Sequence, residues 1–271
     1  MNRIDETFNE LRNKRAALMP YLPLGYPTLA VSAELLRAAE DAGADILELG
    51  VPFSDPLADG PVIQHATHVA LENGMTVDKC LNMVQAARSQ GVTLPLVLMG
   101  YYNPLLRYDL KQFARDAFEA GADGVIVPDL PLEESEALRE ALQDQDLHLI
   151  FLAAPTSDDA RLKKIGKATR GFLYLVSLTG VTGARAGLPE GLEEFVARAR
   201  RATDKPVCVG FGIADAENAR RVAQLADGVI VGSALVQKIG DASNAVENAR
   251  QFIGALANAI HPPSAIQNPK S

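Results

Sequence analysis

The strongest constraint on the fold of this chain is a regular alternation of short apolar runs with longer segments of helical periodicity. The apolar runs are rich in Val, Ile and Leu, which suits buried strands. Such alternation is typical of βα units that feed a parallel sheet. We therefore predict eight strands, at Leu18–Leu22, Ile46–Leu49, Leu96–Met99, Gly124–Val127, Leu147–Leu152, Phe172–Val176, Val207–Val209 and Val229–Val231.

Amphipathic segments follow these runs, and one more precedes the first run. The first segment, Ile4–Lys14, is an extra N-terminal helix that we expect to cap the floor of a barrel. The helical period predicts the others at Ala33–Ala42, Val77–Ser89, Leu110–Ala120, Glu133–Leu142, Asp158–Ala168, Leu192–Ala202, Ala216–Ala226 and Ser243–Ala257.

A weak internal repeat supports the count of eight units. Similar Gly- and Asp-containing turns join a helix end to a strand start at Ala42–Ile46, Ala120–Gly124 and Leu225–Val229. No Pro- or Ser-rich linker separates two halves, which favours one closed (β/α)8 TIM barrel over an open doubly wound sheet with a second small domain. We expect the barrel to span residues 1–260 and a flexible C-terminal tail to span residues 261–271.

Composition narrows the possible partners and the cellular location. Of 271 residues, 26 are basic and 34 acidic, so the net charge of −8 argues against binding nucleic acid or anionic membranes by bulk charge. Cys80 and Cys208 have no nearby cysteine, which fits reduced thiols. The acidic residues near the start argue against a signal peptide, and the lack of any long apolar window argues against a membrane span. We expect a cytoplasmic protein.

The catalytic groups of such a barrel project from the carboxyl ends of its strands. Glu48 lies inside an apolar run, and Asp55 and Asp59 follow in the next loop. Strand alternation leaves two orientations for Glu48, toward the helices or into the barrel. The barrel mouth offers water and polar partners, which favours the inward orientation and acid–base chemistry. The alternatives are a salt bridge to a neighbouring strand for Glu48 and a turn role for each aspartate.

Two glycine-containing loops, Gly210–Gly212 and Gly232–Ser233, follow the last two predicted strands. Loops at these positions bind phosphate through backbone amides in many barrels. The segment Ser177–Pro189 is long and rich in Gly and Thr, which predicts a mobile lid or, alternatively, a plain surface loop. Arg185 in it would meet a phosphate or remain solvated.

Other catalytic motifs give no competing assignment. His65 and His68 are three residues apart on a predicted helix, but no third ligand accompanies them, so we expect no metal site. The motifs of hydrolases, metalloproteases and P-loop enzymes are missing from the sequence. None of the predicted strands contains the lysine that a Schiff-base aldolase would require.

One long motif resembles a known family signature. The segment Leu47–Pro61 (LELGVPFSDPLADGP) closely resembles the signature of tryptophan synthase α subunits. The resemblance extends from about Phe8 to Leu256 and includes the further motifs Pro128–Pro131 with Glu133-Glu134, Gly180–Ala184, Gly210–Ile213 and Gly232–Ala234.

The resemblance implies a reaction, the retro-aldol cleavage of indole-3-glycerol phosphate to indole and glyceraldehyde 3-phosphate. It implies that Glu48 is the general acid and base, and that Asp59 binds the indole N–H and stabilises positive charge on the ring. Tyr174 resembles the family's aromatic hydroxyl near the substrate. The Thr182 hydroxyl would bond to Asp59 when the lid closes.

The resemblance also implies the binding residues. Phosphate would bind to backbone amides of Gly183, Gly212, Gly232 and Ser233. The indole would lie among Tyr21, Met99, Ile126, Leu152 and Phe211, where Tyr21 replaces the phenylalanine common in the family.

By the same resemblance, the chain would work with a β subunit in an α2β2 heterotetramer. The family implies no cofactor on this chain, because pyridoxal phosphate belongs to the β subunit. The partner surface would include the loop at Asp55, the lid, and the loops at Asn103–Pro104 and Pro131. The alternatives are a freestanding indole-releasing lyase, another phosphate-substrate barrel enzyme, or a non-catalytic barrel that only activates a partner.

Overall fold

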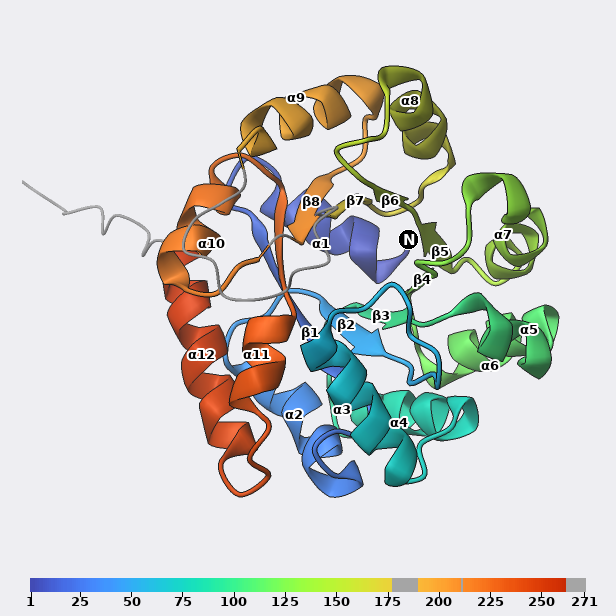
Figure 1. The fold of residues 1–271 in the computed structure, drawn as a ribbon, viewed down its shortest axis with the longest axis vertical. Coiled ribbons are helices and arrows are strands. Elements are labelled where there is room, and N and C mark those ends of the chain that lie inside the picture. The colour runs from blue at the N-terminus through green and yellow to red at the C-terminus, as the bar shows by residue number, and fades with distance from the viewer. Residues whose placement is uncertain (177–189, 211, 262–271) are drawn as a thin grey trace, which may run out of the picture.

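The strands form a barrel at the centre of a ring of helices (Figure 1). The structure is a computed structural model that describes residues 1–176, 190–210 and 212–261. Its strands are β1 (Ala17–Pro23), β2 (Leu47–Gly50), β3 (Leu96–Met99), β4 (Gly124–Ile126), β5 (His148–Ile150), β6 (Leu152–Ala153), β7 (Leu173–Val176), β8 (Val207–Gly210) and β9 (Gly228–Val231).

All paired strands are parallel, and their order is β5-β4-β3-β2-β1-β9-β8-β7-β6. The predicted strand Leu147–Leu152 is divided at Phe151, whose amide donates to the Thr169 hydroxyl at 3.1 Å. The part before Phe151 pairs with β4 and the part after it pairs with β7. This one run therefore closes the barrel, and the predicted eight-stranded barrel is confirmed with its fifth strand interrupted.

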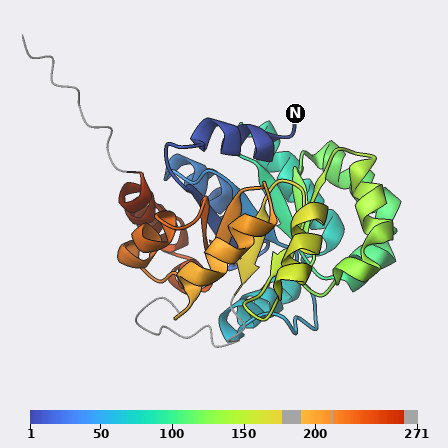
Figure 2. The ribbon, with the colours of Figure 1, turned by 90° about the horizontal axis from the view of Figure 1, so that it is seen from above.

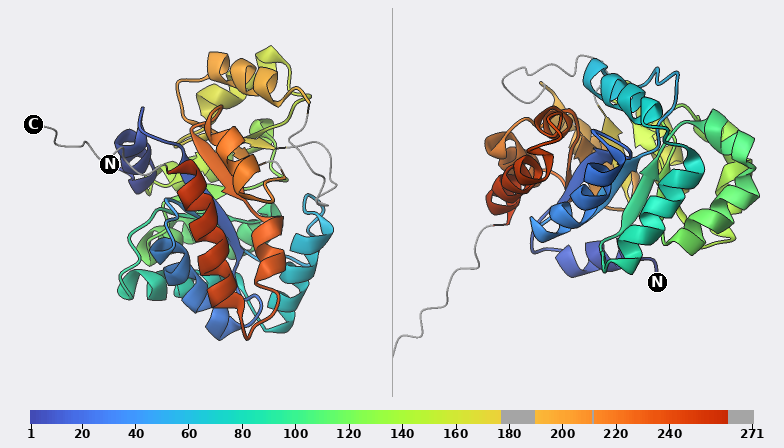
Figure 3. Two further views of the ribbon diagram at one scale, coloured as in Figure 1. Left: turned by 90° about the vertical axis from the view of Figure 1, so that its left-hand side faces the viewer. Right: turned by 90° about the horizontal axis from the view of Figure 1, so that it is seen from below.

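Helices surround the barrel and join its first and last units. Helix α12 packs against α2 and α10, while β1 pairs with β9 (Figure 3). No helix of the described residues is long and apolar enough to cross a membrane. The helices are α1 (Arg3–Leu11), α2 (Leu29–Asp41), α3 (Pro61–Glu72), α4 (Val77–Ser89), α5 (Tyr102–Tyr108), α6 (Leu110–Ala120), α7 (Glu136–Gln143), α8 (Asp159–Ala168), α9 (Leu192–Ala202), α10 (Ala216–Ala223), α11 (Ser233–Lys238) and α12 (Ala245–Ile260), with a short 3₁₀ turn at Leu132–Glu134.

Besides α3 and α11, which lie in none of the predicted helical ranges, two helical segments differ from the sequence expectation. The predicted helix Glu133–Leu142 is divided at Ser135, whose hydroxyl donates to the Leu132 carbonyl at 2.7 Å and ends the 3₁₀ turn before α7 begins. Helix α5 is not predicted at all, because it is short and carries Pro104 in its first turn.

The apolar side chains form two layers. Ile46 belongs to the layer inside the barrel, whereas Leu47 and Leu49 belong to the layer between the strands and the helices. Side chains alternate along a strand, so Glu48 points into the barrel with Ile46. The buried members of the interior layer are Ile4, Phe8, Ala17, Met19, Ile46, Val97, Ile126, Ile150, Phe172, Tyr174, Cys208 and Ile230.

Helix α1 closes the end of the barrel at which the strands begin. Ile4 and Phe8 of α1 belong to the interior layer, and the Phe8 and Phe172 rings lie 5.8 Å apart. Figure 2 shows α1 at one end of the barrel and α3 at the other. The predicted cap on the barrel floor is therefore confirmed, and it leaves the opposite end for the site.

Asp123, directly before β4, connects α1, α4 and β3 at this floor. Its carboxylate is 3% exposed and accepts from Arg88 at 2.7 Å, Arg3 at 2.8 Å and the Leu96 amide at 2.8 Å. Removal of such a carboxylate is strongly destabilising, because its buried partners are left without a counter-charge or hydrogen-bond acceptor. Asp123 thus supports the floor structurally.

We predict that Asp123→Ala lowers the free energy of unfolding by about 3–5 kcal/mol, because Arg88 and the Leu96 amide lose their partner in a buried place. Chemical denaturation followed by circular dichroism measures the change. Asp144→Ala, at an exposed aspartate, is the matched control and should leave stability nearly unchanged. Equal stability of the two variants would contradict the structural role of Asp123.

Candidate active site

Glu48 is a carboxyl group inside an apolar barrel. It lies on β2, is 1% exposed, and is in register with Tyr21 of β1 and Val97 of β3. Its Oε2 atom is buried without a hydrogen-bond partner among the described residues. Among the described residues Glu48 forms no ion pair. The alternative prediction, a salt bridge to a neighbouring strand, is therefore not seen there. A buried carboxyl oxygen without a partner is typical of a functional site.

Burial changes the protonation of Glu48. Loss of water around the carboxyl, together with the smaller effect of the negative charge of Asp59, raises the pKa of Glu48 to about 8. At neutral pH the group is therefore mostly neutral and holds a proton. A carboxyl in this state can act as a general acid and then as a base.

Asp59 is the second carboxyl of the site and comes from the loop after β2. Burial raises its pKa to about 6, and a hydrogen bond from the Tyr101 hydroxyl opposes that shift. Tyr101 Oη donates to Asp59 Oδ2 at 2.9 Å and accepts from the Ala58 amide at 3.0 Å. Two carboxyls with separated pKa values can divide acid and charge-stabilising roles.

Tyr101 is a residue that the sequence reasoning missed. It is buried, and it lies between β3 and α5, directly after the strand that neighbours β2. Its position just after a predicted strand could have identified Tyr101 as a site residue, because side chains at the carboxyl ends of adjacent parallel strands meet at one mouth of the barrel. The structure makes Tyr101 the residue that positions Asp59.

Two tyrosines extend the polar surface of the interior, and glycines make room for them. A Cβ atom at Gly50 would lie 2.1 Å from the Tyr21 hydroxyl, and one at Gly210 would lie 2.6 Å from the Tyr174 hydroxyl. Burial raises the pKa of both tyrosines, and the negative charge of Glu48 adds to the shift of Tyr174. The predicted Tyr174 therefore shares the interior with Glu48.

Most of the expected indole pocket lies on this interior. Ile126 belongs to the buried interior layer, and Met99 and Leu152 pack against it half-buried. Tyr21 is buried opposite Glu48. Phe211 lies outside the described residues. The site therefore combines apolar walls with two carboxyls.

The predicted phosphate loops follow β8 and β9. Gly212 has a φ of +41°, and the space where a Cβ atom would project is open. Gly232 precedes α11, and Ser233 is the first residue of that helix. The first amides of a helix have no partner within it. Gly183, together with Thr182 and Arg185 of the expected lid, lies outside the described residues.

The remaining polar candidates have local partners. Asp55 is exposed and accepts from the Ser54 hydroxyl at 2.5 Å, which fits a turn residue. The ring of His65 packs edge-on against Tyr26, and His68 pairs with Glu72 at 3.3 Å. In the part of the chain that the structure describes, no group of three His, Cys, Asp or Glu residues is placed to hold a metal ion.

We predict that Tyr101→Phe raises the pKa of Asp59 above its value of about 6, because the lost hydroxyl stabilised the ionised carboxylate. NMR titration of the side-chain carboxyl carbons measures this shift. Tyr102→Phe, at the neighbouring tyrosine, is the control and should leave the Asp59 pKa unchanged. A pKa that stays the same in Tyr101→Phe would contradict the positioning role.

Comparisons with known proteins agree with this geometry. The family model "Tryptophan synthase alpha chain" matches residues 8–261. The chain is 50% identical to the tryptophan synthase alpha chain of Chloroflexus aggregans, over 96% of this chain and 98% of that protein. It is 49% identical to that of Roseiflexus castenholzii, over 94% and 99%.

Solved structures give the same result. A structure of Mycobacterium tuberculosis tryptophan synthase matches with a TM-score of 0.90 and 41% identity, over 97% of this chain and 99% of that chain. Tryptophan synthase subunit alpha from Legionella pneumophila matches with a TM-score of 0.89 and 39% identity, over 96% and 98%. The fold, the site geometry and these relatives together show that the chain belongs to the tryptophan synthase alpha chain family.

Proposed function

We propose that this chain cleaves indole-3-glycerol phosphate to indole and glyceraldehyde 3-phosphate, a carbon–carbon lyase reaction, and passes the indole to a β subunit for tryptophan synthesis. The observation that carries the proposal is the Glu48 carboxyl, which is buried, faces the apolar interior and has a pKa of about 8. Such an acid can protonate a ring carbon and then remove a hydroxyl proton at neutral pH.

Glu48 performs both proton transfers of the proposed cleavage. Its neutral carboxyl protonates indole C3, which makes the ring cationic and Glu48 a carboxylate. The carboxylate then takes the proton of the hydroxyl on the carbon attached to the ring. As the carbon–carbon bond breaks, its electron pair returns to the ring and the hydroxyl-bearing carbon becomes the aldehyde. Glu48 ends neutral, so one residue closes the proton balance.

Asp59 stabilises the cationic ring in this mechanism. With a pKa of about 6 it is mostly ionised at pH 7, while Glu48 is mostly neutral. Its carboxylate would accept the indole N–H and oppose the positive charge that develops on the ring. The hydrogen bond from Tyr101 holds that carboxylate in one orientation. A preoriented charge of this kind needs no rearrangement during the reaction.

The remaining residues are proposed to bind the substrate. The indole would lie among Tyr21, Met99, Ile126 and Leu152, with the Tyr174 hydroxyl beside the reacting carbons. The phosphate would bind to backbone amides at Gly212, Gly232 and Ser233. Support comes from the interior position of the apolar residues and from the open space at Gly212.

The partner surface is proposed at the barrel mouth, with an α2β2 heterotetramer as the assembly. Leu57, in the loop between Asp55 and Asp59, is 90% exposed, which is unusual for a large apolar side chain and suits a protein contact. A hollow of about 230 Å³ lies beside the Pro131 loop. The mechanism requires no cofactor on this chain, and pyridoxal phosphate would belong to the β subunit. We also propose a cytoplasmic location.

A freestanding lyase is the second candidate, because the proton transfers require only residues of this chain. The two candidates differ in one measurement, the rate of indole release with and without a cognate β subunit. Stimulation by the β subunit supports the synthase role, and an unchanged rate supports the freestanding enzyme. Absence of indole in both assays would favour another barrel enzyme or a non-catalytic barrel.

We predict that Glu48→Gln lowers kcat for indole release by roughly 10²–10⁴-fold and leaves substrate binding nearly intact, because the amide keeps the shape but cannot transfer protons. The assay follows indole from indole-3-glycerol phosphate, and equilibrium binding measures affinity. Glu119→Gln, at an exposed glutamate of α6, is the matched control. A Glu48→Gln enzyme that keeps most of its kcat would refute the assignment.

We predict a bell-shaped dependence of kcat/KM on pH. Activity rises as Asp59 ionises through a pKa of about 6 and falls as Glu48 loses its proton through a pKa of about 8. In Tyr101→Phe the lower limb should move to higher pH, whereas ionisation of the substrate phosphate stays unchanged. If the lower limb does not move, the ionisation that it reports belongs to the substrate phosphate and not to Asp59.

A further inference from the structure

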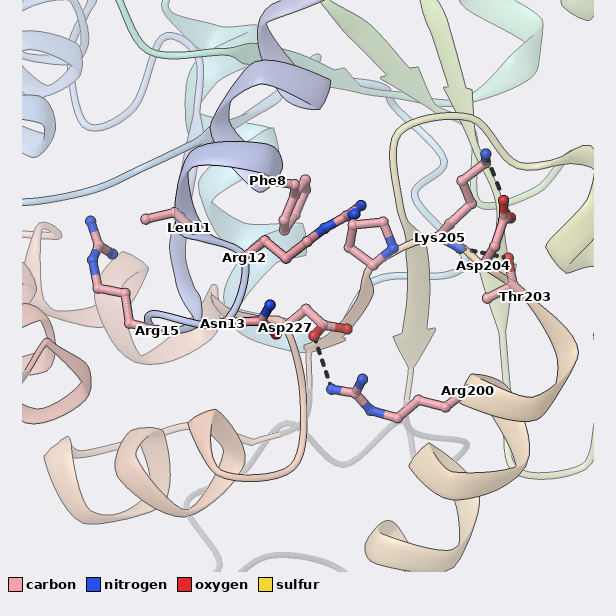
Figure 4. A pocket seen from close by; sticks show the side chains of 11 residues that line it. Phe8, Leu11, Arg12, Asn13, Arg15, Arg200, Thr203, Asp204, Lys205 and Asp227 are labelled. Carbon is pink, nitrogen blue, oxygen red and sulfur yellow. Dashed lines mark hydrogen bonds and ion pairs between the residues drawn. The ribbon is translucent and has the colours of Figure 1, made fainter.

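A second pocket lies at the end of the barrel opposite Glu48, beside α1 and below the starts of β8 and β9 (Figure 4). Its volume of about 360 Å³ is in the range of small-molecule sites. The proposed cleavage does not use it. The pocket is lined by Phe8, Leu11, Arg12, Asn13, Arg15, Arg200, Thr203, Asp204, Lys205, Pro206 and Asp227.

The charge of this pocket is opposite to that of the whole chain. Four cationic and two anionic side chains line it, although the net charge of the protein is −8. Both anions have cationic neighbours: Asp227 pairs with Arg200 at 2.9 Å, and the Asp204 carboxylate lies 3.6 Å from the Lys205 ammonium. Arg15 pairs in turn with Asp45, so Arg12 is the lining cation that remains in excess among the described residues, and this favours an anionic ligand.

Two of the arginines are held in fixed positions by the protein. Arg200 also donates to the Leu225 carbonyl at 3.1 Å, and Asp227 accepts from the Val207 amide at 2.8 Å. Arg15 makes a bidentate pair with Asp45, with both distances 2.7 Å. These contacts build one wall of the pocket without using all of the guanidinium donors.

The other two cations keep donors available. Arg12 has no hydrogen bond or ion pair with any residue of the described parts of the chain, and it comes from the end of α1. Lys205 comes from the segment before β8, and its partner Asp204 is 86% exposed, so that pair is weak. Figure 4 shows the Arg12 and Lys205 side chains above Arg200, with the Lys205 ammonium turned toward Asp204.

The pocket also has an apolar wall. Phe8 is buried against Phe172, and Leu11 and Pro206 complete the wall. A bare inorganic ion would leave this wall in contact with water, whereas an organic group would cover it.

We propose that this pocket binds a small organic phosphate, with the phosphate among Arg12, Arg200 and Lys205 and the organic group against Phe8, Leu11 and Pro206. The three cations come from α1, α9 and the segment before β8, so they approach from different directions. A tetrahedral dianion can accept from all three, which a planar carboxylate does less well. The bound phosphate would connect the floor helix to the β8 side of the barrel.

The test titrates the full chain with phenyl phosphate, inorganic phosphate and benzoate while the backbone amide NMR signals of Asn13 and Lys205 are followed. Phenyl phosphate should shift both signals saturably and bind more tightly than the other two probes. The double variant Arg12→Gln/Lys205→Gln should weaken its binding roughly 10- to 100-fold, because two charged donors are lost. Arg107→Gln, which removes an exposed charge from α5, should leave binding unchanged.

The outcomes separate the parts of the proposal. A parent chain without saturable shifts, or a double variant that binds as tightly as the parent, would overturn the site. Benzoate binding as tightly as phenyl phosphate would overturn the phosphate assignment, and equally tight inorganic phosphate would overturn the organic group. The Gly232 amide reports the catalytic end separately, and indole release is measured on the same variants. Failure of ligand binding in the pocket beside α1 is therefore distinguishable from failure of the proposed cleavage.

Discussion

The burial of one carboxyl in an apolar interior is the constraint on which the rest of the site depends. Glu48 stands two residues after Ile46 on a strand whose inward side chains form the barrel core, and it is 1% exposed. Water would normally solvate such a group, so its removal favours the neutral form. This unfavourable burial occurs at the residue that we propose as the general acid and base.

The surroundings of Glu48 are built to hold this state. Gly50 and Gly210 lack side chains where the Tyr21 and Tyr174 hydroxyls lie, so large polar rings fit inside a narrow barrel. Asp59 comes from the next loop and keeps a lower pKa because Tyr101 donates to it. The result is a pair of carboxyls with different protonation in one apolar space, which is the arrangement that acid–base chemistry on an aromatic substrate needs.

The two ends of the barrel serve different purposes. At the floor, Ile4 and Phe8 of α1 fill the interior, and buried Asp123 connects α1 to α4 and β3. At the mouth lie the bonded pair Asp59 and Tyr101 and the side chain of Leu57, which is 90% exposed. The apolar side chains that fill the interior add to the burial that raises the pKa of Glu48. The floor is also where the cationic pocket lies, beside α1.

The sequence by itself determined the barrel, the floor helix, and the placement of Glu48 on a strand and Asp59 in the loop after it, because apolar periodicity and motif spacing are local properties. Tyr174 was assigned by the family resemblance. Only the tertiary structure decided that Glu48 points inward, since alternation allows both faces until Ile46 is placed in the core. The same holds for Tyr101, whose bond to Asp59 spans 42 positions. The break at Phe151 also has a tertiary cause, the distant Thr169 hydroxyl. Contacts between residues far apart in the chain leave no periodic signal, so only folding reveals them.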